Sequence, residues 1–299
     1  MPTVPDRLAV PGRKFSLEFM PPRSDAQEAG LWLAVRRFEG LRPAFVSVTY
    51  GAGGSRRDRT IRITGRIARE TTLLPVAHLT AVGHSIDELR HVIGSYASVG
   101  VRNILALRGD PSGDPLGEWV PHPQGLHHAA DLVRLTRSLG AFSVGVAAFP
   151  GKHPRSPDIE SDTRHYVDKI RAGADYGITQ MLFSADDYLE LRDRVVAAGA
   201  DVPLLPGIMP VTSLSKLQRI CELSGQQYPQ DLAERLATVG DDKAAATDIG
   251  VSHAIGLGRR LLDEGVETLH FYTFNFTRSV IEVLRALDMM PTPVSPGRS

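Results

Sequence analysis

Glu18 is the acidic residue in the most unusual setting, because it lies inside the apolar run from Phe15 to Phe19. Burial in such a strand penalises the charged form of a carboxyl group, so the sequence predicts a raised pKa. A carboxylic acid that keeps its proton near neutral pH can act as a general acid. The alternative is a structural glutamate that pairs with a basic neighbour or points outward, and the residues alone leave both readings open.

A second group of candidates follows other apolar runs. Asp110 comes after Arg108-Gly109 and before Pro111, where it could stabilise a developing cation or cap an Asp-Pro turn. Arg108 suits a phosphate or carboxylate ligand, or a salt bridge within the fold. Gln180 ends another apolar run. Its carboxamide can both donate to and accept from an amide-like heterocycle such as a pterin, and the alternative is a strand cap.

The sequence predicts no metal site. Its ten histidines, among them His78 and His153, include no H-x-x-x-H or H-E-x-x-H pair. It also lacks the G-x-G-x-x-G, G-x-S-x-G and Walker A motifs. The single cysteine, Cys221, excludes an intrachain disulfide and is typical of a buried apolar position.

The charge balance argues against large polyanionic partners. Lys and Arg together number 34, and so do Asp and Glu, so no net field favours nucleic acid or an anionic membrane. No apolar run reaches the ~18 residues of a transmembrane helix, and the N-terminus lacks the apolar core of a signal peptide. We expect a cytoplasmic protein that acts on small molecules, with no nucleic-acid or membrane partner. Assembly into a homo-oligomer stays open.

Short apolar, β-branched runs alternate with longer amphipathic segments along the whole chain. Eight strand candidates result: Phe15–Phe19, Phe45–Thr49, Val76–Thr80, Asn103–Leu107, Ser143–Ala148, Ile178–Phe183, Pro203–Ile208 and Leu269–Tyr272. Strands separated by helices indicate a parallel sheet with both faces covered. Eight such units in 299 residues predict an α/β fold, a single-domain (β/α)8 TIM barrel.

Capping signals delimit the helices between the strands. Ser24–Gly40 begins with a serine and an acidic turn, and Ser85–Gly100 has the capping-box spacing. The stretch from Val211 to Gly265 is too long for one helix. It predicts extra helices before the last strand, with breaks near Gly225–Pro229 and Gly240.

We expect the barrel to span residues 13–290. Residues 1–12 and 291–299 are rich in proline and glycine, which is typical of mobile tails. Barrel enzymes carry their active sites at the carboxyl ends of the strands. Because the candidate residues follow predicted strands, they should meet at one mouth.

The strand ends resemble those of the methylenetetrahydrofolate reductase family. The matching segments occur in family order from residue 15 to about residue 290: FSLEFMPPR, FVSVTYGAGGSRRDRT, HLTAVG, RNILALRGDP, VGVAAFPGKHP, KIRAGADYGITQ, PGIMPVTS and HFYTFN. Each segment alone is weak, but the combination is highly specific. The family's catalytic domain is a (β/α)8 barrel, in agreement with the predicted fold.

The resemblance implies the reduction of 5,10-methylenetetrahydrofolate to 5-methyltetrahydrofolate. In the family, a hydride from NADH or NADPH reaches the folate through FAD. Glu18 then matches the general acid that opens the folate ring to a 5-iminium cation, and Asp110 matches the acid that stabilises this cation. Gln180, Thr49 and Leu214 match substrate-binding positions. Cofactor-binding positions are matched by Thr49, His78, Leu107, Arg108, Gly109, Asp110, His128, Ala147, His153, Asp162 and Lys169.

The sequence departs from the family pattern around the expected flavin. His128 and Phe149 stand where relatives often have Tyr, Gly151 where Glu is common, Leu214 where some have an aromatic residue, and Phe276 where Arg is usual. These departures keep a second route open, in which NAD(P)H passes its hydride directly to the folate without flavin.

Two other readings remain. One is a related flavin-dependent barrel oxidoreductase, such as a proline-dehydrogenase-like enzyme. The other is a non-catalytic folate- or flavin-binding protein. Glu18 together with Gln180 favours a pterin over a small amino acid, and an acid in an apolar strand favours catalysis over binding alone.

Overall fold

Eight parallel strands close into a barrel in the computed structural model, which describes residues 2–22, 24–50, 54–111, 114 and 117–291. The strands are β1 (Lys14–Phe19), β2 (Val46–Val48), β3 (Pro75–Thr80), β4 (Asn103–Leu107), β5 (Ser143–Ala148), β6 (Tyr176–Leu182), β7 (Leu204–Ile208) and β8 (Thr268–Tyr272). Each pairs with the next, and β8 pairs with β1. The predicted (β/α)8 barrel and its eight strands are confirmed, with the same bounds for β4 and β5.

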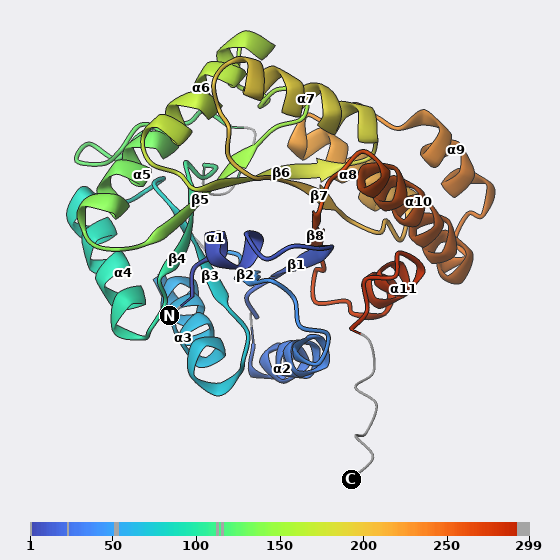
Figure 1. The fold of residues 1–299 in the computed structure, drawn as a ribbon, viewed down its shortest axis with the longest axis horizontal. Coiled ribbons are helices and arrows are strands. Elements are labelled where there is room, and N and C mark those ends of the chain that lie inside the picture. Colours follow the sequence, from blue (N-terminus) through green and yellow to red (C-terminus); the bar gives the residue numbers. More distant parts are fainter. Residues whose placement is uncertain (1, 23, 51–53, 112–113, 115–116, 292–299) are drawn as a thin grey trace.

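Helices surround the barrel, as Figure 1 shows. They are α2 (Asp25–Glu39), α3 (Gly54–Glu70), α4 (Ile86–Ser98), α5 (Ala129–Ser138), α6 (Ile159–Arg171), α7 (Ala185–Ala197), α8 (Leu214–Ser224), α9 (Gln230–Thr238), α10 (Lys243–Asp263) and α11 (Arg278–Ala286). The predicted caps at Ser24 and Ser85 are present. The extra helices α8, α9 and α10 also lie where the sequence placed them. Gly225 ends α8 in the left-handed conformation, with φ of 67°.

Alternation along β1 shows how the strands serve both the core and the site. Leu17 and Phe19 are fully buried in the cluster that also holds Phe38 of α2. Ser16 lies on the other face of the strand, where its hydroxyl meets His270 of β8. Because side chains alternate along a strand, Glu18 shares the inner face with Ser16. The period of the strand therefore places an acid inside the barrel.

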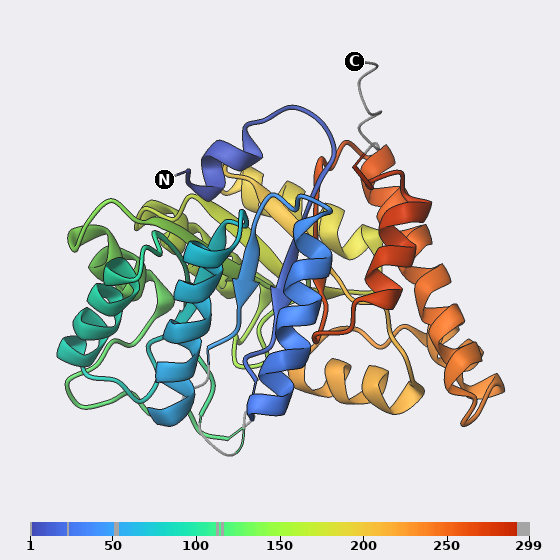
Figure 2. The same cartoon turned by 90° about the horizontal axis from the view of Figure 1, so that it is seen from below.

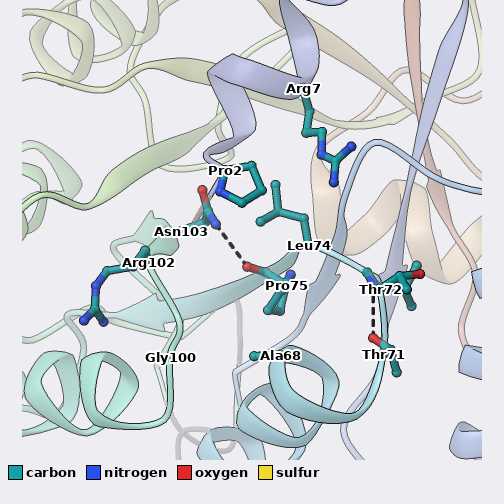
Figure 3. A pocket seen from close by; sticks show the side chains of 11 residues that line it. Pro2, Arg7, Ala68, Thr71, Thr72, Leu74, Pro75, Gly100, Arg102 and Asn103 are labelled. Carbon is teal, nitrogen blue, oxygen red and sulfur yellow. Dashed lines mark hydrogen bonds between the residues drawn. The ribbon is translucent and has the colours of Figure 1, made fainter.

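The N-terminal segment departs from the expectation of a tail at residues 1–12. Residues 4–8 form the short helix α1 (Val4–Leu8), capped by Thr3. Val4 is fully buried, and its amide donates to Asn103 Oδ1 at 3.0 Å. Asn103 in turn donates to the carbonyl of Pro75 (Figure 3). Because these contacts lie where β3 and β4 begin, α1 covers the amino-terminal end of the barrel, away from α8 (Figure 2). Residues 292–299 of the expected C-terminal tail lie outside the described residues.

Candidate functional site

Four side chains meet on the inner face at the carboxyl ends of β1, β2, β3 and β8, and we call them the Glu18 cluster: Glu18, Thr49, His78 and His270. The hydroxyl of Thr49 donates to Glu18 Oε1 at 3.0 Å. The Nε2 atoms of His78 and His270 lie 3.5 and 3.6 Å from Glu18 Oε2. The Glu18 side chain is 12% exposed, and the two histidines are buried. Glu18 is thus a buried carboxyl group faced by two imidazoles.

The prediction of a raised pKa for Glu18 is wrong for the ligand-free site. Burial acts to raise this pKa, but attraction to His78, followed by the contributions of His270 and Thr49, outweighs it, and the pKa is lowered. Burial lowers the pKa of His78 more than Glu18 raises it. The sequence showed the apolar strand but not the two imidazoles that other strands bring to it. The protonation of Glu18 and that of His78 are therefore coupled.

The two imidazoles are held in place but not fully satisfied. His270 Nδ1 lies 2.8 Å from the hydroxyl of Ser16, which leaves Nε2 directed at Glu18. Among the residues that the structure describes, neither His270 Nε2 nor His78 Nε2 has a hydrogen-bond partner. A distance of about 3.5 Å is longer than a good hydrogen bond. The two Nε2 atoms can therefore still form hydrogen bonds with a bound ligand.

The segment after β8 fastens the end of β1. Asn275 accepts from the amide of Met20 at 2.9 Å and donates to its carbonyl at 3.0 Å. The Thr273 hydroxyl donates to the carbonyl of Glu18 at 2.6 Å. To make these contacts, Phe274 and Asn275 adopt φ values of 46° and 66°, which are uncommon for residues with a side chain. The backbone of the acid is therefore fixed from two sides.

Tyr272 links the Glu18 cluster to Gln180. Tyr272 pairs with Glu18 in the sheet, and its hydroxyl donates to the carbonyl of Thr179 at 2.7 Å. The ring crosses Gly207, where a Cβ atom would lie 2.5 Å from it, so this position requires glycine. The register of β6 shifts between Ile178 and Met181. Such bulges redirect side chains beside active sites, and Gln180 lies within this one.

A cavity of about 430 Å³ opens beside Gln180, and we call it the β4–β6 pocket. Most of the residues predicted from the sequence line it. They are Leu107, Arg108, Gly109, Asp110, His128, Ala147, His153, Asp162, Lys169 and Gln180. Ten of the residues expected to bind cofactor or folate therefore line one cavity. Glu18, Thr49 and His78 form the separate cluster described above. Leu214 lies apart, packed with Phe183 and Tyr272 against Leu217.

Cationic groups gather on one wall of the β4–β6 pocket. Arg108, Arg155 and Lys169 all line it. Burial lowers the pKa of Lys169 to about 8, and its ammonium donates to the carbonyl of Ala147 at 2.6 Å. Burial, aided by Arg108, lowers the pKa of His153 to about 4, so this imidazole is neutral at physiological pH. The wall is suited to an anion such as a diphosphate.

The acids of the pocket differ in role. Asp162 accepts from the His153 amide at 3.2 Å and from the Ser156 hydroxyl at 2.8 Å, so it shapes the loop between β5 and α6. Asp110 lies 3.7 Å from Arg155 and is 60% exposed. Its partial burial raises its pKa, but because so much of the side chain meets solvent, we expect it to be ionised at neutral pH. Asp110 thus presents a negative charge at the mouth.

Sequence reasoning missed four residues of the site. His270 belongs to the Glu18 cluster, and its place two residues before Tyr272 on an inward-facing register was the available signal. Arg155 approaches Asp110. Trp119 stacks on Arg108. His165 stacks on His128 with ring centroids 5.6 Å apart. Arg155 and Trp119 lie in loops, and His165 of α6 meets His128 at the start of α5, so no strand period encodes these contacts.

The residues of the β4–β6 pocket fit a dinucleotide. Arg108 and Lys169 supply positive charge for a diphosphate, and the stacked rings of His128 and His165 offer flat surfaces for a base. Gly109, which has no side chain, lets a ligand approach the backbone closely. Gly109 has φ of 83°, and a Cβ there would lie 2.5 Å from Val82. FAD and NAD(P)H are both dinucleotides, so this donor set accommodates either.

A second cavity, of about 260 Å³, lies at the amino-terminal end of the barrel beside α1 and includes Arg7 and Arg102 (Figure 3). It contains none of the residues predicted from the sequence. Within the part of the chain that the structure covers, no helix could cross a membrane, and no three His, Cys, Asp or Glu side chains are grouped to hold a metal ion.

Comparison with known proteins identifies the family. The family model of methylenetetrahydrofolate reductase matches residues 6–288. The 5,10-methylenetetrahydrofolate reductase of Escherichia coli K12 is 36% identical over 276 residues, which cover 92% of this chain and 91% of that protein. The enzyme of the same name from Pectobacterium carotovorum is 37% identical over 278 residues, covering 92% and 90%.

Other relatives agree in sequence or fold. Methylenetetrahydrofolate reductase 1 of Schizosaccharomyces pombe is 33% identical over 98% of this chain, which spans 49% of that longer protein. A solved structure from Clostridium thermocellum, described as binding two copies of 5-methyl-5,6,7,8-tetrahydrofolic acid, has the same fold. It superposes with a TM-score of 0.65 at 13% identity, covering 95% of this chain and 98% of that one. The family model and the 36–37% identical relatives together show that this chain belongs to the methylenetetrahydrofolate reductase family.

Proposed function

We propose that the chain reduces 5,10-methylenetetrahydrofolate to 5-methyltetrahydrofolate with a hydride from NADH or NADPH. The observation that carries the proposal is the Glu18 cluster, a buried acid faced by two histidines at the mouth of a barrel of this family. Ring opening of the substrate needs one proton donor in a site that excludes water. A general acid shielded in this way suits that need.

Glu18 delivers the proton to N10 of the folate. In the ligand-free cluster the pKa of Glu18 is lowered, because His78, His270 and Thr49 together outweigh the effect of burial. A pteridine over the mouth removes water from the carboxylate, and loss of solvation favours the protonated acid. Proton transfer to N10 then breaks the bond between N10 and the methylene carbon. The product of this step is a cation at N5, and the methylene carbon is the hydride acceptor.

Asp110 and Gln180 act on the same pteridine from the side of β4 and β6. The exposed carboxylate of Asp110 stabilises the positive charge that develops at N5. The carboxamide of Gln180 donates one hydrogen bond to the amide edge of the ring and accepts one from it. Its placement in the β-bulge and on the pocket wall supports this role.

Arg108, His153 and Lys169 would hold the diphosphate of a dinucleotide. When FAD is bound, it supplies a two-electron carrier between the nicotinamide and the folate. Direct transfer from NAD(P)H to the folate is the second candidate. It is supported by the same donor set, which serves the diphosphate of NAD(P)H as well as that of FAD.

Turnover and the visible spectrum test the proposal together. Without oxygen, the purified protein should oxidise more than one NADH or NADPH per chain only when 5,10-methylenetetrahydrofolate is present. Flavin absorption with ping-pong kinetics would support the FAD route. A colourless, active preparation with intersecting double-reciprocal lines would support direct transfer. Binding of folate without any reduction would overturn the proposal in favour of a non-catalytic binding protein.

A further inference from the structure

Trp119 lies between β4 and α5 and packs on the cationic wall of the β4–β6 pocket. The guanidinium carbon of Arg108 lies 5.1 Å from the centroid of the Trp119 ring, within the range of a cation–π contact. The indole Nε1 donates to the carbonyl oxygen of Gly109 at 3.2 Å. Trp119 is therefore bound to both residues that follow β4.

The backbone under this contact is fixed. Gly109 has φ of 83°, and its close approach to Val82 leaves no room for a side chain. Arg155 holds the neighbouring segment, because its NH2 donates to the carbonyl of Gly117 at 2.5 Å. The Arg108 side chain thus extends from a rigid turn, and Trp119 covers it from a segment that is itself anchored.

The hydrogen-bonding donors of Arg108 are poorly satisfied where they lie. Its NH2 is 3.2 Å from His153 Nε2, while the Arg155 amide donates to Nδ1 of the same ring at 3.0 Å. The pKa of His153 is lowered to about 4 by burial, so the ring is neutral, and a neutral imidazole has a single acceptor nitrogen. Two donors therefore compete for one acceptor, and an incoming anion would relieve the competition.

An aromatic face holds a guanidinium without using its N–H groups, whereas a carboxylate would occupy two of them. We propose that Trp119 is a positioning residue for the dinucleotide: its ring holds the Arg108 guanidinium so that its N–H groups meet the diphosphate. The inference rests on the proposed function, because it takes its ligand from that reaction. Trp119 should therefore affect the affinity for the dinucleotide and leave the affinity for folate unchanged.

The chain offers a matched control. It has two tryptophans, and Trp32 also stacks on an arginine, with the Arg66 guanidinium 4.1 Å from its ring centroid. That pair lies between α2 and α3, outside the β4–β6 pocket. Trp119→Leu removes the aromatic face at the pocket, Trp119→Phe keeps one, and Trp32→Leu removes an equivalent stack elsewhere.

Calorimetric titration of the protein as isolated tests the proposal, with NADH and 5-methyltetrahydrofolate as separate ligands. In a flavin-free preparation, Trp119→Leu should raise the NADH dissociation constant about five- to tenfold. Trp119→Phe should stay within about threefold of wild type, and Trp32→Leu should not change it. Affinity for 5-methyltetrahydrofolate should be unaltered in all three. Where the isolated protein carries flavin, flavin absorbance per chain should rank the variants in the same order.

In a flavin-free preparation, unchanged NADH affinity in Trp119→Leu would overturn the proposal, and in a preparation that carries flavin, unchanged flavin absorbance per chain would overturn it. So would an equal loss of NADH and 5-methyltetrahydrofolate affinity, since that would mean a general structural role. Failure of the proposed function is a different result: wild type would bind NADH with the predicted ranking of variants, yet reduce no folate. The circular dichroism spectrum and melting temperature of each variant confirm that it is folded.

Discussion

The Glu18 cluster and the β4–β6 pocket, which the proposed function assigns to one site, are built differently. The cluster consists of residues in or directly after strands on the inner face of the barrel: the buried His78 and His270, and the partly buried Glu18 and Thr49. The pocket draws most of its polar groups from loops and helix starts, and Asp110, for example, is 60% exposed. A proton-transfer site needs controlled solvation, whereas a pocket for an exchanging ligand needs access. We expect substitutions in the cluster to reduce catalysis and substitutions in the pocket to reduce binding.

The largest effect should follow substitution of the acid. Glu18→Gln keeps the shape of the side chain but cannot donate the proton, so kcat should fall by about 10²–10⁴-fold. Steady-state kinetics with 5,10-methylenetetrahydrofolate measures this. Glu267→Gln, which removes an exposed partner of Lys14, is the control and should retain wild-type kcat. Near wild-type turnover in Glu18→Gln would remove the catalytic role of the cluster.

A smaller effect is expected for Gln180 because it acts on binding. Gln180→Ala should weaken folate affinity by about 1–3 kcal/mol, the range for a polar partner left unsatisfied. This corresponds to about five- to 150-fold in the dissociation constant. Titration with 5-methyltetrahydrofolate measures it, and NADH affinity should change little. Unaltered folate affinity would make Gln180 a structural part of the bulge in β6.

The pH dependence of dinucleotide binding tests the β4–β6 pocket independently of the Glu18 cluster. Burial lowers the pKa of Lys169 to about 8, so its positive charge is present below that pH and lost above it. NADH affinity should therefore fall several-fold between pH 7 and pH 9.5, by titration calorimetry. His153, with its pKa near 4, stays neutral across this range. Lys169→Met should bind more weakly at pH 7 and lose this pH dependence. A retained pH dependence in the variant would assign it to another group.

The smallest effect on activity is expected at the amino-terminal end of the barrel. Asn103→Ala removes the acceptor for the Val4 amide and the donor to Pro75. Leaving a buried amide unsatisfied should reduce the free energy of unfolding by about 1–3 kcal/mol. Denaturant unfolding measures this loss, and kcat should remain near wild type. A loss of activity at full stability would mean that α1 influences the mouth from the opposite end.

The strands were predictable because both their period and their apolar content are local properties of the sequence. β4 and β5 keep their predicted bounds, since each is a short apolar run between clear breaks. The breaks around α8, α9 and α10 were equally predictable, because Gly225 has the left-handed conformation that glycine favours. Helix α1 was missed because five residues carry little periodicity. What holds it is Asn103, about a hundred residues away.

The site was predictable in composition but not in electrostatics. Ten predicted residues line one pocket, because strand ends converge in any parallel barrel. The pKa of Glu18 went the other way, since it depends on His78 from β3 and on His270 from β8, the strand that pairs with β1 when the barrel closes. Leu214 packs against a separate apolar cluster, which likewise forms only when distant parts of the chain come together in the fold. Contacts such as Trp119 with Arg108 depend on loop paths that no local pattern specifies.

Anaerobic product analysis tests the central claim most directly. Wild type and Glu18→Gln are incubated with NADH and 5,10-methylenetetrahydrofolate, and the folates are separated by chromatography. We predict one 5-methyltetrahydrofolate formed for each NADH oxidised by wild type. In the same interval, Glu18→Gln should bind folate but form about 1% of that product or less, in line with the loss of general acid catalysis. Oxidation of NADH without 5-methyltetrahydrofolate, or equal product from both proteins, would contradict the claim that Glu18 drives folate reduction here.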